Sequence, residues 1–275
     1  MKRRTTTAII AFCCFIPFLI FSDGYLWNIA LAIICGMSMF ELLCCTKTLA
    51  NPGLSVPALA YSVLVPLFLQ GMTGTLANFA NIFLFVMFAI GVLSRNRYHT
   101  SQITLVAGLC LFVTNTLSGL IVIRRQPDIG LYLMILVFLI SWGSDTGAYC
   151  SGRLFGSRPL APELSPKKTV EGAIGAVIIT TVVCVLYGLI CNSFAFVEAN
   201  VGLLALTGFL GSLFAQTGDL IASLFKRHYS IKDFGTIFPG HGGFMDRFDS
   251  VIGVTLFILL LTSRPELVPL FTAIL

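Results

Sequence analysis

Carboxylates, hydroxyls and basic side chains gather between residues 219 and 249, near the end of an otherwise apolar chain. Asp219, Ser223 and Lys226 are spaced i, i+4 and i+7, which places them along one face of a helix. Asp246 and Asp249 are spaced i and i+3, on what is predicted to be the first turn of another helix. Mg2+ prefers such oxygen ligands and commonly bridges them to phosphate groups. The spacing therefore predicts chemistry on a phosphate.

A glycine-rich turn separates these two groups. Residues 239–243 read Pro-Gly-His-Gly-Gly, which cannot easily continue a helix. The glycines around His241 let backbone amides approach an anion closely, as in phosphate-binding nests. A structural alternative remains open, in which Lys226 and Arg227 are stop-transfer charges and Asp219 is bonded to a neighbouring helix.

Composition places this chemistry in a membrane. The 275 residues are 57% hydrophobic and 11% charged, which leaves too little polar surface for a water-soluble globule. We predict an all-α, polytopic transmembrane helical bundle of about nine spans, forming a single membrane domain (1–275) with N-terminal spans in 1–125 and the catalytic spans in 126–275. The predicted spans are 7–22, 25–45, 56–71, 77–94, 102–123, 129–150, 170–191, 201–225 and 248–263.

The distribution of charge predicts the orientation. If the N-terminus is cytoplasmic, every Lys and Arg except Arg124, Arg125 and Arg264 lies on the cytoplasmic side. The longest connections, 151–169 and 226–247, then face the cytoplasm as well. Residues 1–22 also have the basic start and apolar stretch of a secretory signal, but no small-x-small cleavage site follows, which favours a retained anchor.

Three acidic residues fall inside predicted spans, where a charge requires a partner, water or a function. Glu41 is expected only to extend its carboxylate to the near membrane surface. Asp145 and Asp219 both have polar neighbours in the sequence, which favours a functional role.

The polar segment resembles the signature of the phosphatidate cytidylyltransferases, also called CDP-diacylglycerol synthases, and no position of that signature departs from it. The matching residues are Ser223, Lys226, Arg227, Lys232, Asp233, His241, Gly242, Gly243, Asp246, Arg247 and Asp249. Residues 144–146 and 165–172 also resemble elements of this family. The likeness covers the C-terminal half well and the N-terminal half only in character.

The resemblance implies that CTP and phosphatidic acid give CDP-diacylglycerol and pyrophosphate, with Mg2+ required. It implies Asp219 and Asp246 as metal ligands, with Asp249 and Asp145 as further or outer ligands. The implied catalytic residues are Asp219, Asp246, Lys226 and Arg247. The implied substrate-binding residues are Lys167, Lys168, Ser223, Arg227, Lys232, His241, Gly242 and Gly243. For His241 a structural role in the turn, and for Lys167 and Lys168 a role as orientation charges, remain alternatives.

The implied partners are CTP, phosphatidic acid, the lipid bilayer and a second copy in a homodimer, and no nucleic acid is expected. The implied location is the cytoplasmic (inner) membrane, with the active site facing the cytoplasm. Two other functions stay open: a membrane nucleotidyl or phosphoryl transferase acting on another lipid, and an ion-coupled secondary transporter.

Overall fold

The computed structural model describes residues 22, 24–69, 73–94, 97–194, 197–238, 240, 242–263 and 269–273. Of the first predicted span, 7–22, only residue 22 is among the described residues. Pro239 and His241 also lie outside them. The predictions for these positions are therefore not tested by the structure.

Helices account for most of the described chain, and each one corresponds to a predicted span. They are α2 (Tyr25–Cys45), α3 (Pro52–Phe68), α4 (Thr73–Leu93), α5 (Thr100–Arg124), α6 (Gly130–Phe155), α7 (Val170–Phe194), α8 (Val201–His228) and α9 (Met245–Thr262). The helix starts follow local chemistry: Pro52 opens α3, and the Asn200 side chain accepts the Leu203 amide in the first turn of α8.

Six of the described helices, α2, α4, α5, α6, α7 and α8, are long and apolar enough to cross a membrane. The exposed side of α7 is also apolar, with Ile174, Ile178, Val182 and Leu186 recurring every four residues. Such a stripe is compatible with hydrocarbon rather than with water. The chain is thus a multi-pass membrane protein, as predicted, whereas the count of nine spans and the orientation stay predictions.

Two short antiparallel strand pairs, which the sequence did not predict, accompany the predicted helices. Strands β1 (Pro159–Ala161) and β2 (Ser165–Thr169) form a hairpin inside the predicted 151–169 connection. Strand β3 (Val197–Ala199) pairs with β4 (Phe271–Ala273) close to the C-terminus. Both pairs join segments too short for a hydrophobic periodicity to develop, so apolar patterning could not reveal them.

The chain divides into two compact units, which are described separately below. The first unit comprises Met1–Arg125 and Tyr229–Arg247, and the second comprises Gln126–His228 and Phe248–Leu275. Helix α9 begins in the first unit and continues in the second. The segment between α8 and α9 therefore groups with residues far from it in sequence.

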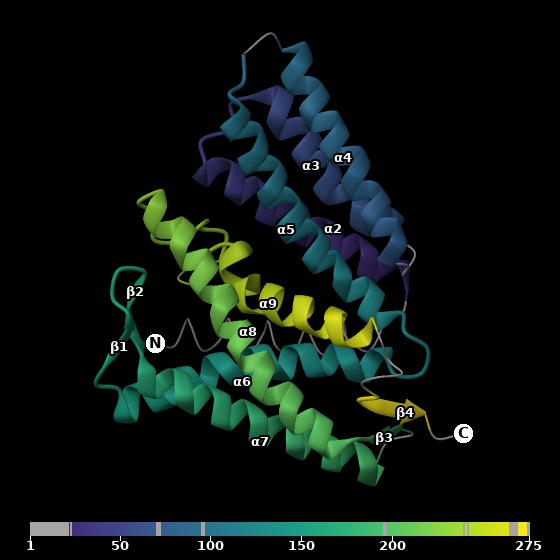
Figure 1. The fold of residues 1–275 in the computed structure, drawn as a ribbon, viewed down its shortest axis with the longest axis vertical. Helices are drawn as coiled ribbons and strands as arrows, with labels where there is room; N and C mark the ends of the chain where they lie inside the picture. The colour runs from purple at the N-terminus through teal and green to yellow at the C-terminus, as the bar shows by residue number, and fades with distance from the viewer. Residues whose placement is uncertain are drawn as a thin grey trace. The chain divides into compact units, whose positions relative to one another are not determined.

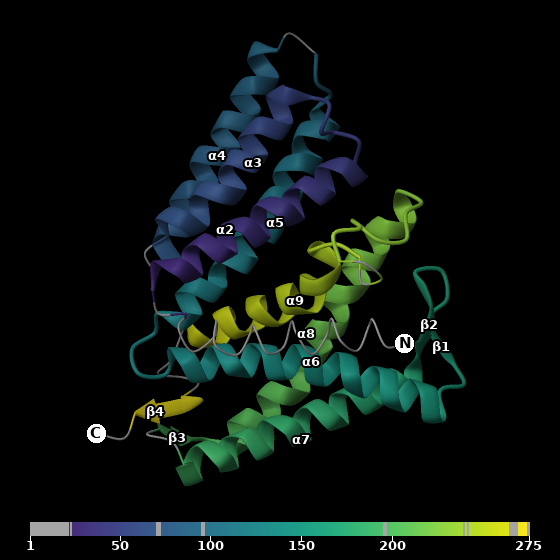
Figure 2. The ribbon, with the colours of Figure 1, turned by 180° about the vertical axis from the view of Figure 1, so that it is seen from behind.

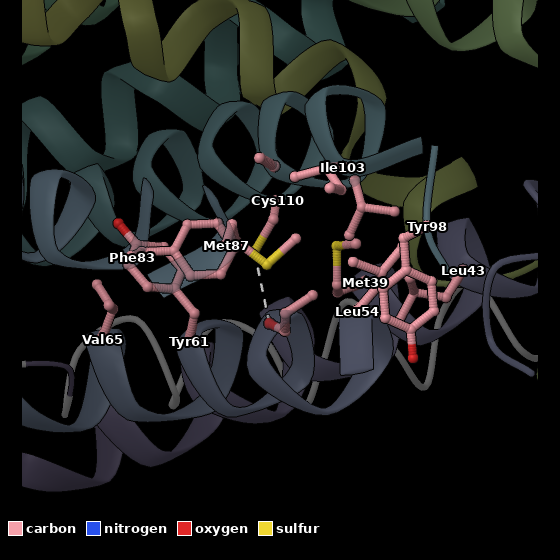
Figure 3. Packing of buried hydrophobic residues seen from close by; sticks show 13 residues of the cluster. Met39, Leu43, Leu54, Tyr61, Val65, Phe83, Met87, Tyr98, Ile103 and Cys110 are labelled. Carbon is pink, nitrogen blue, oxygen red and sulfur yellow. Dashed lines mark hydrogen bonds between the residues drawn. The ribbon is translucent and has the colours of Figure 1, made fainter. Parts of the chain in front are cut away.

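Helices α2, α3, α4 and α5 run side by side in the first unit (Figures 1 and 2). Their core is a cluster of buried side chains from all four helices, including Met39, Tyr61, Phe83 and Cys110 (Figure 3). The Tyr61 and Phe83 rings lie 4.4 Å apart between centroids, and the Tyr61 hydroxyl donates to Asn115 Oδ1 at 2.6 Å. Apolar packing, with few buried polar groups, holds this unit together.

Arg124 and Arg125, two exceptions to the predicted charge distribution, have structural partners in the first unit. Arg125 donates from Nη1 to the Leu69 carbonyl and from Nη2 to Asn28 Oδ1, both at 3.0 Å. Arg124 Nε donates to Ser22 Oγ at 2.7 Å. These two charges tie the end of α5 to the start of α2 and the end of α3, which explains their position without reference to membrane orientation.

Small residues let the helices of the second unit approach closely. A Cβ on Gly147 of α6 would lie 3.0 Å from the Ala176 backbone of α7, and one on Gly208 of α8 would lie 3.0 Å from the Thr181 backbone. Gly218 of α8 faces Gly253 of α9, where an added Cβ would lie 3.2 Å from the Gly253 nitrogen and would also collide with the Asp249 carbonyl oxygen. Small residues at such crossings are typical of membrane helices.

Replacing Gly218 with Ala is therefore expected to push α8 and α9 apart and to lower stability by about 1–3 kcal/mol. The obstacle is backbone, which cannot rotate away as a side chain can. Gly202→Ala on the same helix is the matched control, because its Cβ would meet only Asn200 Oδ1, at 3.6 Å. The thermal unfolding midpoint in detergent should fall for Gly218→Ala alone, and equal midpoints would contradict the close packing.

Candidate active site

Three carboxylates from three helices gather in the second unit: Asp145 of α6, Asp219 of α8 and Asp249 of α9. Asp249 lies within electrostatic range of Asp219, Asp145 and Lys226. Ser250 Oγ donates to Asp145 Oδ2 at 3.1 Å, which fixes α6 to α9 at this point. The structure thus brings together three of the four residues predicted as metal ligands.

Lys168 reaches this group from strand β2 and forms an ion pair with Asp219. The Lys168 and Asp219 side chains are 25% and 27% exposed, so the pair is partly accessible. Lys167, the preceding residue, is exposed. Side chains alternate between the two faces of a strand, so the two lysines have different environments although they are neighbours in sequence.

The hairpin that carries Lys168 is held at several points. Arg227 Nε donates to the Leu164 carbonyl at 2.9 Å. The Glu171 carboxylate accepts the Ser157 and Arg158 amides at 3.0 and 3.2 Å, and the Ser157 hydroxyl at 2.8 Å. Glu171 therefore ties the chain after α6 to the start of α7, which gives it a structural function.

The predicted polar face of α8 exists. Asp219, Ser223 and Lys226 lie on one continuous helix that extends to His228. Ser223 is buried, whereas Lys226 is half-buried. Basic residues in the last turn of this helix also suit the negative end of its dipole.

Asp246, in the first unit, organises the turn before α9. This carboxylate is 7% exposed, and its Oδ2 accepts the Phe234 amide at 2.8 Å and the Gly243 amide at 3.1 Å. Gly242 has a φ of 80°, in the left-handed region that a glycine adopts without strain. Backbone hydrogen bonds thus fix the position of Asp246.

Glu41 of α2 is the functional candidate that the sequence analysis missed. Its carboxylate is 3% exposed and accepts the Phe244 and Met245 amides, each at 2.9 Å. The expectation that Glu41 extends to the membrane surface is wrong, because its charge is satisfied by the N-terminus of α9. Protein carboxylates therefore accept hydrogen bonds from three successive amides, those of Gly243, Phe244 and Met245.

The remaining predicted site residues lie near these groups in sequence. Lys232 and Arg247 are exposed and belong to the first unit, as do Gly242 and Gly243. The substrate-binding roles predicted for these residues and for His241 stay predictions.

Comparison with known proteins decides the family. A sequence model of the cytidylyltransferase family matches residues 2–263. The chain belongs to the cytidylyltransferase family. Proteins named phosphatidate cytidylyltransferase from Staphylococcus epidermidis and Staphylococcus aureus are each 36% identical to it over 262 residues, which is 92% of this chain and 96% of theirs. The relative from Staphylococcus haemolyticus is 35% identical over 263 residues, with the same coverage.

A cytidylyltransferase acts on a nucleoside triphosphate, whose phosphates can supply some of the ligands of a bound metal ion. Within the described ranges, no three His, Cys, Asp or Glu side chains form a group that could hold a metal ion by themselves. Mg2+ at nucleotide sites is usually bound by one or two carboxylates, with water and substrate phosphates completing its shell. Asp219 and Asp249 in the second unit fit that arrangement.

Proposed function

We propose that this chain is a phosphatidate cytidylyltransferase, which converts CTP and phosphatidic acid into CDP-diacylglycerol and pyrophosphate. The observation that carries this proposal is the similarity to proteins of that name along almost the whole length of both chains. A secondary transporter is not supported, because the matched family is one of transferases. The signature residues favour phosphatidic acid over another lipid.

The reaction needs little acid–base chemistry from the protein. The second pKa of a phosphate monoester is about 6, so phosphatidate is already largely dianionic at neutral pH. One of its oxygens forms a bond to the α-phosphorus of CTP, and the bond from that phosphorus to the β-phosphate bridging oxygen breaks, which releases pyrophosphate. The protein must therefore align two anions and offset their charge.

The residues of the second unit suit this task. Lys168 and Lys226 carry positive charge beside the carboxylate group, where it would offset charge on the triphosphate. Asp219 and Asp249 would hold Mg2+, with Asp145 as an outer ligand. Bound Mg2+ would neutralise phosphate charge and orient the leaving group. Ser223, from the same face of α8, would donate to a phosphate oxygen.

For the first unit, the proposal keeps Asp246 as a metal ligand and Arg247, Lys232 and Gly242 as phosphate contacts, on the strength of the signature. The Gly243 amide is different, because it already donates a hydrogen bond to Asp246. Its part would thus be to shape the turn rather than to bind phosphate directly.

We further propose that the protein lies in the cytoplasmic membrane with its active site facing the cytoplasm, where CTP is available. The distribution of Lys and Arg supports this orientation. The homodimer implied by the family resemblance also remains a proposal.

The direct test supplies the purified protein with labelled CTP, Mg2+ and phosphatidic acid in mixed micelles. Labelled liponucleotide and pyrophosphate are expected in equal amounts. Product from a polyprenyl phosphate but not from phosphatidic acid would shift the substrate to another lipid. Absence of any product would overturn the proposal.

A further inference from the structure

Glu41 of α2 lies against two backbone segments of the first unit, at residue 235 and at residues 243–245. Its two oxygens accept the first amides of α9, from Phe244 and Met245. A Cβ added to Gly243 would collide with both of these oxygens, and one added to Gly235 would lie 2.9 Å from the Glu41 carboxyl carbon. Two glycines thus make room for one carboxylate, because a side chain at either position would occupy its place.

The hydrogen bonds made by Glu41 determine what remains for Asp246. The first amides of a helix have no acceptor within the helix and need one from elsewhere. Glu41 supplies it for Phe244 and Met245, while Asp246 supplies it for Gly243 and Phe234. Without the Glu41 carboxylate, the Phe244 and Met245 amides would compete for Asp246, the next carboxylate along the chain.

We propose that Glu41 is a positioning residue for cytidylyl transfer: it anchors the start of α9 and thereby leaves Asp246 in its working position. This inference rests on the proposed function. It assigns a role in the reaction to α2, a helix outside the sequence signature. Glu41 itself touches no substrate in this role and acts through the backbone of residues 243–245.

Glu41→Gln tests the proposal, because the amide keeps one acceptor oxygen but turns a donor toward the second N–H group. In the full-length protein, kcat is expected to fall about 10- to 100-fold, as for other displaced site groups. The Mg2+ concentration for half-maximal activity should rise. Hydrogen exchange at the amides of residues 243–246 should become faster, which is a readout independent of turnover.

Two further variants make the result specific. Ser38→Ala removes a buried hydroxyl one turn earlier on α2 that has no hydrogen-bond partner in the described part of the chain, and it should leave all three measurements unchanged. Glu41→Asp keeps the charge on a shorter side chain, so it should lose less kcat than Glu41→Gln. It also serves if Glu41→Gln does not fold.

Glu41→Gln with unaltered kcat, Mg2+ dependence and exchange would overturn the proposal. So would a variant that only unfolds at a lower temperature while the folded enzyme keeps its kcat, because the role would then be structural alone. A greater loss in Glu41→Asp than in Glu41→Gln would also contradict it. Absence of product from the unaltered protein would refute the proposed function instead, and the exchange rates would still show whether Glu41 holds the turn.

Discussion

Asp219→Asn is expected to lower kcat at least ~100-fold, since mutation of even an outer-shell partner of a bound metal lowers metal affinity or activity about 10- to 100-fold. Asn keeps the size of Asp219 but removes the negative charge that would bind Mg2+. Stability should change little, because the lost ion pair with Lys168 is partly exposed and such pairs contribute about 0–1 kcal/mol. The measurement is steady-state CTP-dependent turnover, with the unfolding midpoint recorded in parallel.

Lys47→Ala is the control for Asp219→Asn. Lys47 is exposed in the first unit, and both Lys and Ala carry a Cβ, so the φ of 57° at this position is strained equally in each. Turnover should stay near that of the unaltered protein. Near-normal turnover in Asp219→Asn would remove Asp219 from the metal site.

The same substitution at Asp246 should behave differently. Asp246→Asn is also expected to lower turnover, yet Asp246 is buried and accepts two backbone amides on one oxygen. Reduced stability would then accompany reduced turnover, so this variant cannot by itself separate metal binding from structure. Asp219 is the sharper test of the metal site.

Lys168→Ala is expected to lower kcat/KM for CTP about 10- to 100-fold, whereas the neighbouring Lys167→Ala should have little effect. The reason is geometric, because only Lys168 pairs with Asp219 and so lies beside the carboxylates. Initial rates at varied CTP concentrations for the two variants check this. Equal losses, or a larger loss at Lys167, would contradict the assignment of Lys168 to the site.

A double substitution would separate the two roles of Lys168. If Lys168 acts only by holding Asp219, Lys168→Ala should cause no further loss of kcat/KM for CTP in a protein that already carries Asp219→Asn. If it also contacts the triphosphate, a further loss in kcat/KM for CTP is expected. The interaction between the two substitutions, measured as a double-mutant cycle, decides between these cases.

Apolar runs predicted the helices well because a membrane span must be long and apolar. The span 25–45 coincides with α2, and the helical spacing of Asp219, Ser223 and Lys226 holds on α8. Local sequence could not predict β3 pairing with β4, or Lys168 pairing with Asp219, because each joins segments that only the folded chain brings together. The signature identified Asp246, but not the backbone amides that its side chain accepts.

Glu41 shows why part of a site can escape sequence analysis. An acidic residue near the end of a span usually has access to the membrane surface, and nothing in residues 25–45 indicates otherwise. Its partners lie 203 and 204 residues away. Gly235 and Gly243 leave room for the Glu41 carboxylate, but the sequence alone does not connect these glycines with Glu41.

The separation between Glu41 and Phe244 has a consequence for biosynthesis. At about 5–20 residues per second, the ribosome needs roughly 10–40 s to make the 203 residues that lead from Glu41 to Phe244. During that time α2 holds a carboxylate whose final hydrogen-bond donors, the Phe244 and Met245 amides, do not yet exist. A nascent chain halted at residue 228 would contain helices α2 to α5 of the first unit and still lack the amides that bind the Glu41 carboxylate. Completion of this unit therefore depends on synthesis of most of the other.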